Sequence, residues 1–177
     1  MATPAPRSHV GGWRLVQLIA MTDDDFAWLL EEEPGRVRGG LRVVDGGLAP
    51  REVTALVRRV TAEEAIHTSR ELSWMVTEDA QVVGMISCTK PAGERRYEIG
   101  YGTAPACMGR GVATAAVAAM IDVARDQGLF GLTAETSVSN PASQRVLEKN
   151  GFVRRGRRVD AEDGPLVCWS HDLRMVA

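Results

Sequence analysis

The chain has 177 residues, of which 45% are hydrophobic and 25% charged, and its formal net charge is −2. These proportions are typical of one globular domain that buries its own core. The slightly acidic balance argues against a nucleic-acid partner, because such proteins usually carry a basic excess. No stretch reaches the roughly 18 consecutive apolar residues that a membrane-spanning helix needs, so we expect no membrane partner either.

The N-terminus and the cysteines set expectations about context. Residues 1–12 lack the apolar segment of a secretory signal, so we expect a flexible tail followed by one domain over residues 13–177. Cys88, Cys107 and Cys168 are odd in number and scattered, without a C-x-x-C pair. This pattern favours reduced thiols in a cytoplasmic protein over a disulfide framework or a zinc site.

The first half of the domain predicts a strand, two helices and a meander. WRLVQLIA, residues 13–20, has the composition of a strand. In the acidic segment that follows, Thr22 can cap a helix and Pro34–Gly35 can end it. After a glycine-rich joint, a second helix is expected to begin at Pro50 and to continue through residue 71. Three consecutive strands, joined by short polar turns, are then expected at residues 72–78, 81–90 and 96–103.

The second half predicts two helices, each leading into strands. The segment from Gly111 to Gln127 is apolar on almost all sides, which indicates a helix covered by other elements. The next helix has Asn140 as its cap, Pro141 in its first turn and Asn150–Gly151 as its stop. The remaining strands are expected at residues 129–137, 152–159 and 166–173. This order predicts a mixed α/β sheet, antiparallel at first, with one crossover.

The glycine turn before the apolar helix has three interpretations. A P-loop would need a lysine after its last glycine, and Gly111 is followed by none. A dinucleotide-binding turn would need a third glycine, where Thr114 stands, and a later carboxylate, for which Glu135 is near. The third interpretation is a pyrophosphate bound by backbone N–H groups at the helix N-terminus, where Gly109 and Gly111 let it approach and Arg110 adds charge.

Two segments carry a resemblance to a known family. YEIGYGTAPACMGRGVATAAV, residues 97–117, and NPASQRVLEKNGF, residues 140–152, together resemble the GNAT N-acetyltransferase superfamily. The second segment is most similar to the RimJ/RimL-like branch of ribosomal-protein N-acetyltransferases. The family's phosphate motif, [Q/R]-x-x-G-x-[G/A], falls on Met108, Gly111 and Ala113, so the usual polar side chain at its first position is missing. The resemblance implies the GNAT fold, an α/β fold with a mixed central sheet of about six to seven strands flanked by helices.

The same resemblance implies acetyl-CoA as cosubstrate, no metal, and direct transfer of the acetyl group to an amine in a ternary complex. A bulge in the segment GYGT, residues 100–103, would leave free backbone amides for the pantetheine arm, because glycines in strands often mark such close approaches. The residues expected to bind the cofactor are Gly102, Thr103, Met108, Gly109, Arg110, Gly111, Val112, Ala113, Thr114, Asn140 and Ser143.

Two residues are candidates for the catalytic groups. A base assists the reaction, because the attacking amine must be neutral and the pKa values of α-amino groups and lysines are about 8 and about 10.4. Glu98 lies on the strand that approaches the thioester in this family, so we expect it to act as base through water, unless it only holds a structural partner. Many members use a tyrosine as acid where Leu147 stands here. The RimL-like resemblance implies Ser143 instead, although Ser143 and Asn140 could serve only the helix N-terminus.

The acceptor is expected to be a protein N-terminal α-amine or a small-molecule amine. The acidic helix at residues 23–33 could attract a cationic acceptor, although helix charges usually face solvent. Arg154, Arg155, Arg157 and Arg158 could meet an acidic partner or the second subunit of a homodimer, whereas a charged edge strand is the simpler interpretation. Two other classes stay open: a non-catalytic acyl-CoA-binding module and a nicotinamide dinucleotide-binding protein.

Overall fold

The computed structural model describes residues 7–8, 16–31 and 37–173, to which all structural statements below refer. The strands are β1 (Arg7–Ser8), β2 (Gln17–Ala20), β3 (Val37–Arg38), β4 (Leu41–Val43), β5 (Ser73–Glu78), β6 (Gln81–Pro91), β7 (Arg96–Thr103), β8 (Gly131–Ser137), β9 (Val153–Asp160) and β10 (Gly164–Asp172). The helices are α1 (Asp23–Leu30), α2 (Arg51–Ala65), α3 (Val112–Asp126) and α4 (Pro141–Lys149), and a 3₁₀ turn spans Pro105–Cys107.

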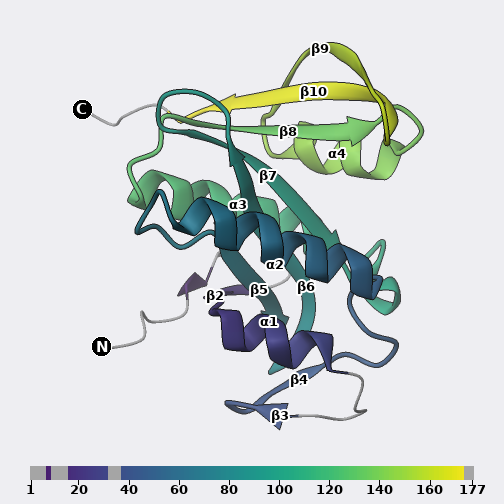
Figure 1. Cartoon of the computed structure of the whole chain (residues 1–177). Helices are drawn as coiled ribbons and strands as arrows, with labels where there is room; N and C mark the ends of the chain where they lie inside the picture. Colours follow the sequence, from purple (N-terminus) through teal and green to yellow (C-terminus); the bar gives the residue numbers. More distant parts are fainter. Residues whose placement is uncertain (1–6, 9–15, 32–36, 174–177) are drawn as a thin grey trace.

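The strands form one mixed sheet in the order β1-β2-β5-β6-β7-β8-β10-β9, with β4 beside β6 and β3 beside β4 (Figure 1). The strands β5, β6 and β7 are antiparallel neighbours, which confirms the predicted meander. The strands β7 and β8 are parallel and are joined by the crossover through α3. The sheet has ten strands within the described ranges, more than expected, because the short strands β1, β3 and β4 join it.

Helices cover both faces of the sheet. Figure 1 shows α1 and α2 on one face and α3 on the other. Successive residues of β5 point to opposite faces. Trp74 and Val76 therefore join the large buried cluster that contains α3, whereas Met75 packs with Trp28 of α1 in a second cluster. Helix α3 is buried along most of its length, as its apolar pattern predicted.

Three predicted helix boundaries, at Thr22, Asn140 and Gly151, are confirmed. At the start of α1, the backbone N–H of Thr22 donates to Asp25 Oδ2 at 2.7 Å. Asn140 caps α4, because its Oδ1 accepts the N–H of Ser143 at 3.0 Å. Gly151, with φ at +74°, follows the end of α4. Helix α1 ends at Leu30 and not at the expected residue 33, since the backbone of Glu31 is already extended. The predicted stop at Pro34–Gly35 and the start of the first strand, residues 13–15, lie outside the described residues.

Two expectations about elements are wrong. Helix α2 ends at Ala65 and not at residue 71. Ile66, which is 80% exposed, is the only apolar residue in the segment IHTSRE, residues 66–71, so this segment has no apolar face that a longer helix could bury. The glycine-rich joint contains the hairpin β3–β4, whose turn has Gly39 and Gly40 at φ +55° and +82°. Two glycines with positive φ fit a two-residue hairpin turn. The pair Gly39–Gly40 is therefore a sequence signal from which this hairpin could have been predicted.

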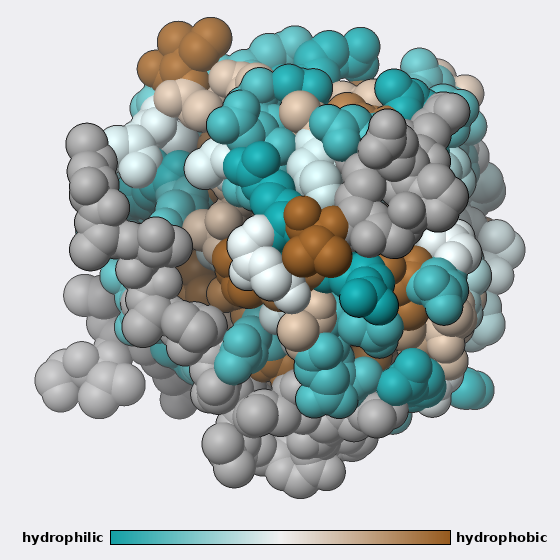
Figure 2. Space-filling model, turned by 90° about the horizontal axis from the view of Figure 1, so that it is seen from below, coloured by the Kyte–Doolittle hydropathy of each residue, from teal (hydrophilic) through white to brown (hydrophobic). Residues whose placement is uncertain are grey.

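The face of the molecule seen from below carries a mixture of residue kinds (Figure 2). In the view from below, hydrophobic side chains form small groups between hydrophilic ones (Figure 2). Among the helices described here, none has both the length and the apolar character required to cross a membrane.

Candidate active site

The parallel pairing of β7 and β8 ends inside the sheet. The last residue pair that the structure describes between them is Glu98 with Thr133. Residues 99–103 of β7 continue to pair with β6 on the other side, and β8 continues to pair with β10. The two strands therefore diverge beyond Glu98, and one side of β7 keeps backbone groups without a strand partner.

The irregularity beside this gap lies in β6, and the bulge expected in GYGT is therefore wrong. Cys88 pairs with Ile99 and Lys90 pairs with Glu98, so Thr89 is the extra residue. Its hydroxyl donates to the carbonyl oxygen of Glu98 at 3.3 Å. A bulge bends its strand and increases the local twist. The position of the bulge depends on how β6 and β7 pair, so the residues of β7 alone do not reveal it.

The glycine turn places the N-terminus of α3 at the same gap. Gly109 and Gly111 have φ of +72° and +84°, which glycine adopts readily. Gly111 is the cap residue of α3, and no side-chain hydrogen bond caps this end in the part of the chain that the structure describes. The first N–H groups of a helix lack intrahelical acceptors, and the dipole adds positive potential there. The turn therefore suits an anion such as a pyrophosphate.

A cavity of about 720 Å³ lies between the glycine turn, β7 and α4. All eleven residues that the sequence assigns to cofactor binding line it. They are Gly102, Thr103, Met108, Gly109, Arg110, Gly111, Val112, Ala113, Thr114, Asn140 and Ser143. Six further residues, which the sequence analysis did not assign to cofactor binding, also line it: Tyr101, Cys107, Ala142, Arg145, Val146 and Lys149.

Two basic residues of α4 stand out among these additions. Arg145 and Lys149 are four residues apart, so they share one face of the helix. The C-terminal end of α4 lies beside the first turn of α3, since Asn150 Nδ2 donates to the carbonyl oxygen of Thr114 at 3.1 Å. The i, i+4 spacing of two basic residues after the cap Asn140 was a signal that could have identified them.

Arg110 is less available than its sequence position suggests. Its Nη2 donates to Glu78 Oε2 at 2.9 Å, and its Nη1 lies 3.6 Å from Cys107 Sγ. Met108, which replaces the family's polar residue, is 66% exposed. The basic character of this cavity therefore depends on α4 as well as on the turn.

Glu98 lies outside this cavity and lines a second one of about 530 Å³ between α2, β6 and β7. Its Oε1 is 3.1 Å from Lys90 Nζ. Burial raises the pKa of the Glu98 carboxyl, Lys90 opposes this, and the charge of Glu135 raises the pKa further. A carboxylate whose pKa is raised toward neutrality is a more effective proton acceptor.

The second cavity combines carboxylates with an apolar wall. Glu63, Glu64 and Glu98 line it with Lys90 as the opposing charge, so its net charge is negative. Glu64 accepts a hydrogen bond from the Tyr97 hydroxyl at 2.7 Å. The other lining residues are Leu56, Val57, Val60, His67 and Thr89. Such a cavity attracts a cationic group attached to an apolar one.

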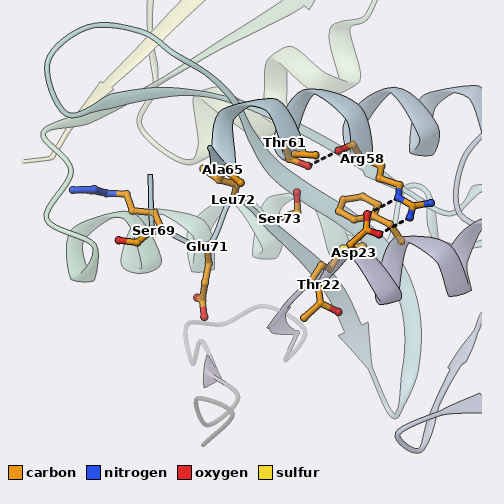
Figure 3. Close-up of a pocket in the computed structure, with 13 residues that line it drawn as sticks. Thr22, Asp23, Arg58, Thr61, Ala65, Ser69, Glu71, Leu72 and Ser73 are labelled. Carbon is orange, nitrogen blue, oxygen red and sulfur yellow. Dashed lines mark hydrogen bonds and ion pairs between the residues drawn. The ribbon is translucent and has the colours of Figure 1, made fainter. Parts of the chain in front are cut away.

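Two of the three aspartates in the first turn of α1 are held by hydrogen bonds from arginines. Arg58 donates two hydrogen bonds of 2.6 Å to Asp23 (Figure 3), and Arg38 donates to Asp25 at 2.8 Å. Asp23 and Arg58 line a third cavity, of about 450 Å³, together with Ser73 at the start of β5. The strand β6 lies between β5 and β7, so this cavity is separate from the gap beyond Glu98.

The arginines of β9 lie on the edge strand of the sheet, as the simpler interpretation predicted. Arg158 donates to both carboxylate oxygens of Glu135, at 2.7 and 2.6 Å. The guanidinium of Arg154 stacks over Trp169. These two arginines therefore have partners within the chain.

Comparison with known proteins agrees with this geometry. The family model described as "Acetyltransferase (GNAT) domain" matches residues 14–153. The chain belongs to this family and is an acetyltransferase by class. No curated protein matches the sequence. Among the described strands, only the pairs β7–β8 and β4–β6 are parallel. This mostly antiparallel sheet is not the doubly wound arrangement that a dinucleotide-binding protein requires.

Three solved structures of acetyltransferases share this fold. RimJ of Mycobacterium smegmatis, in complex with CoA-disulfide, is 21% identical over 94% of this chain and 85% of its own, with a TM-score of 0.62. A chimera of the spermidine N-acetyltransferase SpeG from Vibrio cholerae and hSSAT is 18% identical over 89% and 95%, with a TM-score of 0.64. Ribosomal-protein-S5-alanine acetyltransferase from Vibrio fischeri is 17% identical over 94% and 96%, with a TM-score of 0.63.

Substitution of Gly102 separates ligand binding from folding. A Cβ at Gly102 would meet no atom within 4 Å, although the residue lines the cavity. We expect Gly102→Val to change the free energy of unfolding by less than about 0.5 kcal/mol and to weaken CoA binding by about tenfold or more, or 1.4 kcal/mol. Calorimetric titration and urea unfolding measure the two effects.

The matched control is Gly156→Val in β9, where a Cβ also meets no atom within 4 Å. This variant should keep both its stability and its affinity for CoA. Unchanged CoA binding by Gly102→Val would show that the ligand does not run along this part of β7.

Proposed function

We propose that this protein transfers the acetyl group of acetyl-CoA to a cationic primary amine by direct attack in a ternary complex. The observation that carries the proposal is the divergence of β7 and β8 beyond Glu98. One cavity, at the N-terminus of α3, suits the phosphates and the pantetheine arm, and the acidic cavity beside α2 suits the amine. Because β7 contributes to both cavities, the gap beside it is where the two substrates meet.

The cavity at α3 fits CoA in its chemistry. The free N–H groups of the first turn of α3 would hold the pyrophosphate. The side chains of Arg145 and Lys149 would supply the cationic contacts that Met108 does not provide. The backbone of Gly102 and Thr103 would pair with the amides of the pantetheine arm, in place of the strand partner that β7 loses.

The acidic cavity argues for an acceptor that carries positive charge. Glu63 and Glu64 would attract an ammonium group, and the apolar wall formed by Leu56 and Val60 would contact the carbon chain beside it. Both a protein α-amine and an aliphatic diamine satisfy this description. Ribosomal protein and spermidine acetyltransferases among the similar structures are consistent with either choice.

Glu98 is the residue that we assign to removal of the amine proton, directly or through water. The raised pKa of its carboxyl makes it a stronger base than an exposed glutamate. Thiol release from acetyl-CoA should occur with an aliphatic diamine or with a peptide that has a free α-amine, and not with the same peptide blocked at its N-terminus. Glu98→Gln should lower kcat by about 100-fold and leave the affinity for CoA unchanged.

The control for this test is Glu148→Gln, an exposed glutamate of α4. It should retain full turnover. Binding of CoA without thiol release for any amine would contradict the proposal and leave the chain as an acyl-CoA-binding module.

The pH dependence of turnover should follow Glu98. A base must be unprotonated, so turnover rises with pH as the carboxyl loses its proton. Lys90 lowers the pKa of Glu98, and its removal in Lys90→Met should raise that pKa. The rising limb of the kcat profile should therefore move to higher pH, as measured by thiol release in a series of buffers.

Arg125→Met is the matched control for Lys90→Met, because Arg125 pairs with Asp122 on the exposed side of α3. Its pH profile should coincide with that of the wild type. A Lys90→Met profile that also coincides would rule out Glu98 as the titrating base.

A further inference from the structure

Tyr101 and Ser143 hold each other through two hydrogen bonds at the margin of the CoA cavity. The Tyr101 hydroxyl donates to the carbonyl oxygen of Ser143 at 3.1 Å. Ser143 Oγ donates to the Tyr101 hydroxyl, also at 3.1 Å. Both residues line the cavity. The hydroxyl of Tyr101 is thus fixed between β7 and α4.

This pair lies toward the thiol end of the cavity. The glycine turn, where the phosphates would bind, follows the C-terminal end of β7, whereas Tyr101 is only three residues from Glu98 on the same strand. At about 3.3 Å per residue, that distance is roughly 10 Å along the strand. The α4 position where many family members carry a tyrosine holds Leu147, which is fully buried in the core. Its side chain supplies no hydroxyl to the sulfur.

We propose that the Tyr101 hydroxyl, oriented by Ser143, donates a hydrogen bond to the CoA sulfur as the carbon–sulfur bond breaks. The inference rests on the proposed function. In the reaction the C–N bond forms, the C–S bond breaks and its electron pair stays on sulfur. The amine proton leaves through Glu98. Tyr101 keeps its own proton, and the sulfur takes a proton from solvent when CoA is released.

The geometry assigns different roles to the two hydroxyls. The hydrogen of Ser143 Oγ is directed at Tyr101, so Ser143 is a positioning residue. The Tyr101 hydrogen points to a neutral carbonyl, and a thiolate is a stronger acceptor because it is charged. Burial raises the pKa of the Tyr101 hydroxyl, and the hydrogen bond from Ser143 opposes this shift. Thiols lose their proton near pH 8.5, and at about this pH the Tyr101 hydroxyl keeps its proton and remains a hydrogen-bond donor.

The test is the pKa of the CoA thiol in its complex, followed by the ultraviolet absorbance of the thiolate. Desulfo-CoA in complex with the same protein gives the blank. A hydrogen bond to the charged form lowers a pKa, so Tyr101→Phe should raise the pKa of the bound thiol by about one unit above the wild-type complex. Ser143→Ala should raise it less. Turnover of Tyr101→Phe should fall about 10-fold to 100-fold at nearly constant KM for acetyl-CoA.

The control is Tyr97→Phe, the other tyrosine of the chain, whose hydroxyl bonds Glu64 and does not line the CoA cavity. It should leave the pKa of the bound thiol unchanged. An equal thiol pKa in the wild type, Tyr101→Phe and Ser143→Ala complexes would overturn the role of Tyr101 while the CoA site stands. Failure of the wild type to bind CoA would overturn the proposed function and this inference together.

Discussion

The loss of pairing between β7 and β8 beyond Glu98 is the constraint on which the rest of the site depends. Backbone N–H and C=O groups inside a protein need hydrogen-bond partners. A strand that leaves its neighbour in the middle of a sheet must therefore bind solvent or a ligand along the exposed side. A ligand arm with amide groups of its own matches this requirement better than an apolar chain, and the pantetheine arm of CoA has such amides.

The other parts of the site follow from this gap. The crossover between the two parallel strands is α3, so its N-terminus lies where they diverge, and Gly109 and Gly111 expose its first N–H groups. Helix α4 faces the same cavity with Arg145 and Lys149. In the acidic cavity beside α2, the bulge at Thr89 brings Lys90 opposite Glu98. The proposed anion site, thiol end and base are thus ordered along β7.

The sequence predicted the parts of this site that depend on local signals. Strand β7 was expected at residues 96–103 and lies there, and the cap Asn140 was read from its position before Pro141. Side-chain contacts between distant segments carry no such signal. The acidic cavity joins α2 to β6 and β7, and the hydrogen bond from Tyr97 to Glu64 spans 33 positions. The partner of Tyr101 on α4 is hidden for the same reason, since 42 positions separate it from Ser143.

Thermal unfolding with acetyl-CoA, free CoA and NADH tests the central claim, that the gap beside β7 and the N-terminus of α3 form a CoA site. A ligand at 100 times its dissociation constant stabilises a protein by about 2.7 kcal/mol, which corresponds to a rise of several degrees in Tm for a chain of this size. The account predicts this rise with both CoA forms for the wild type and its loss in Gly111→Val. A rise with NADH and none with either CoA form would contradict it.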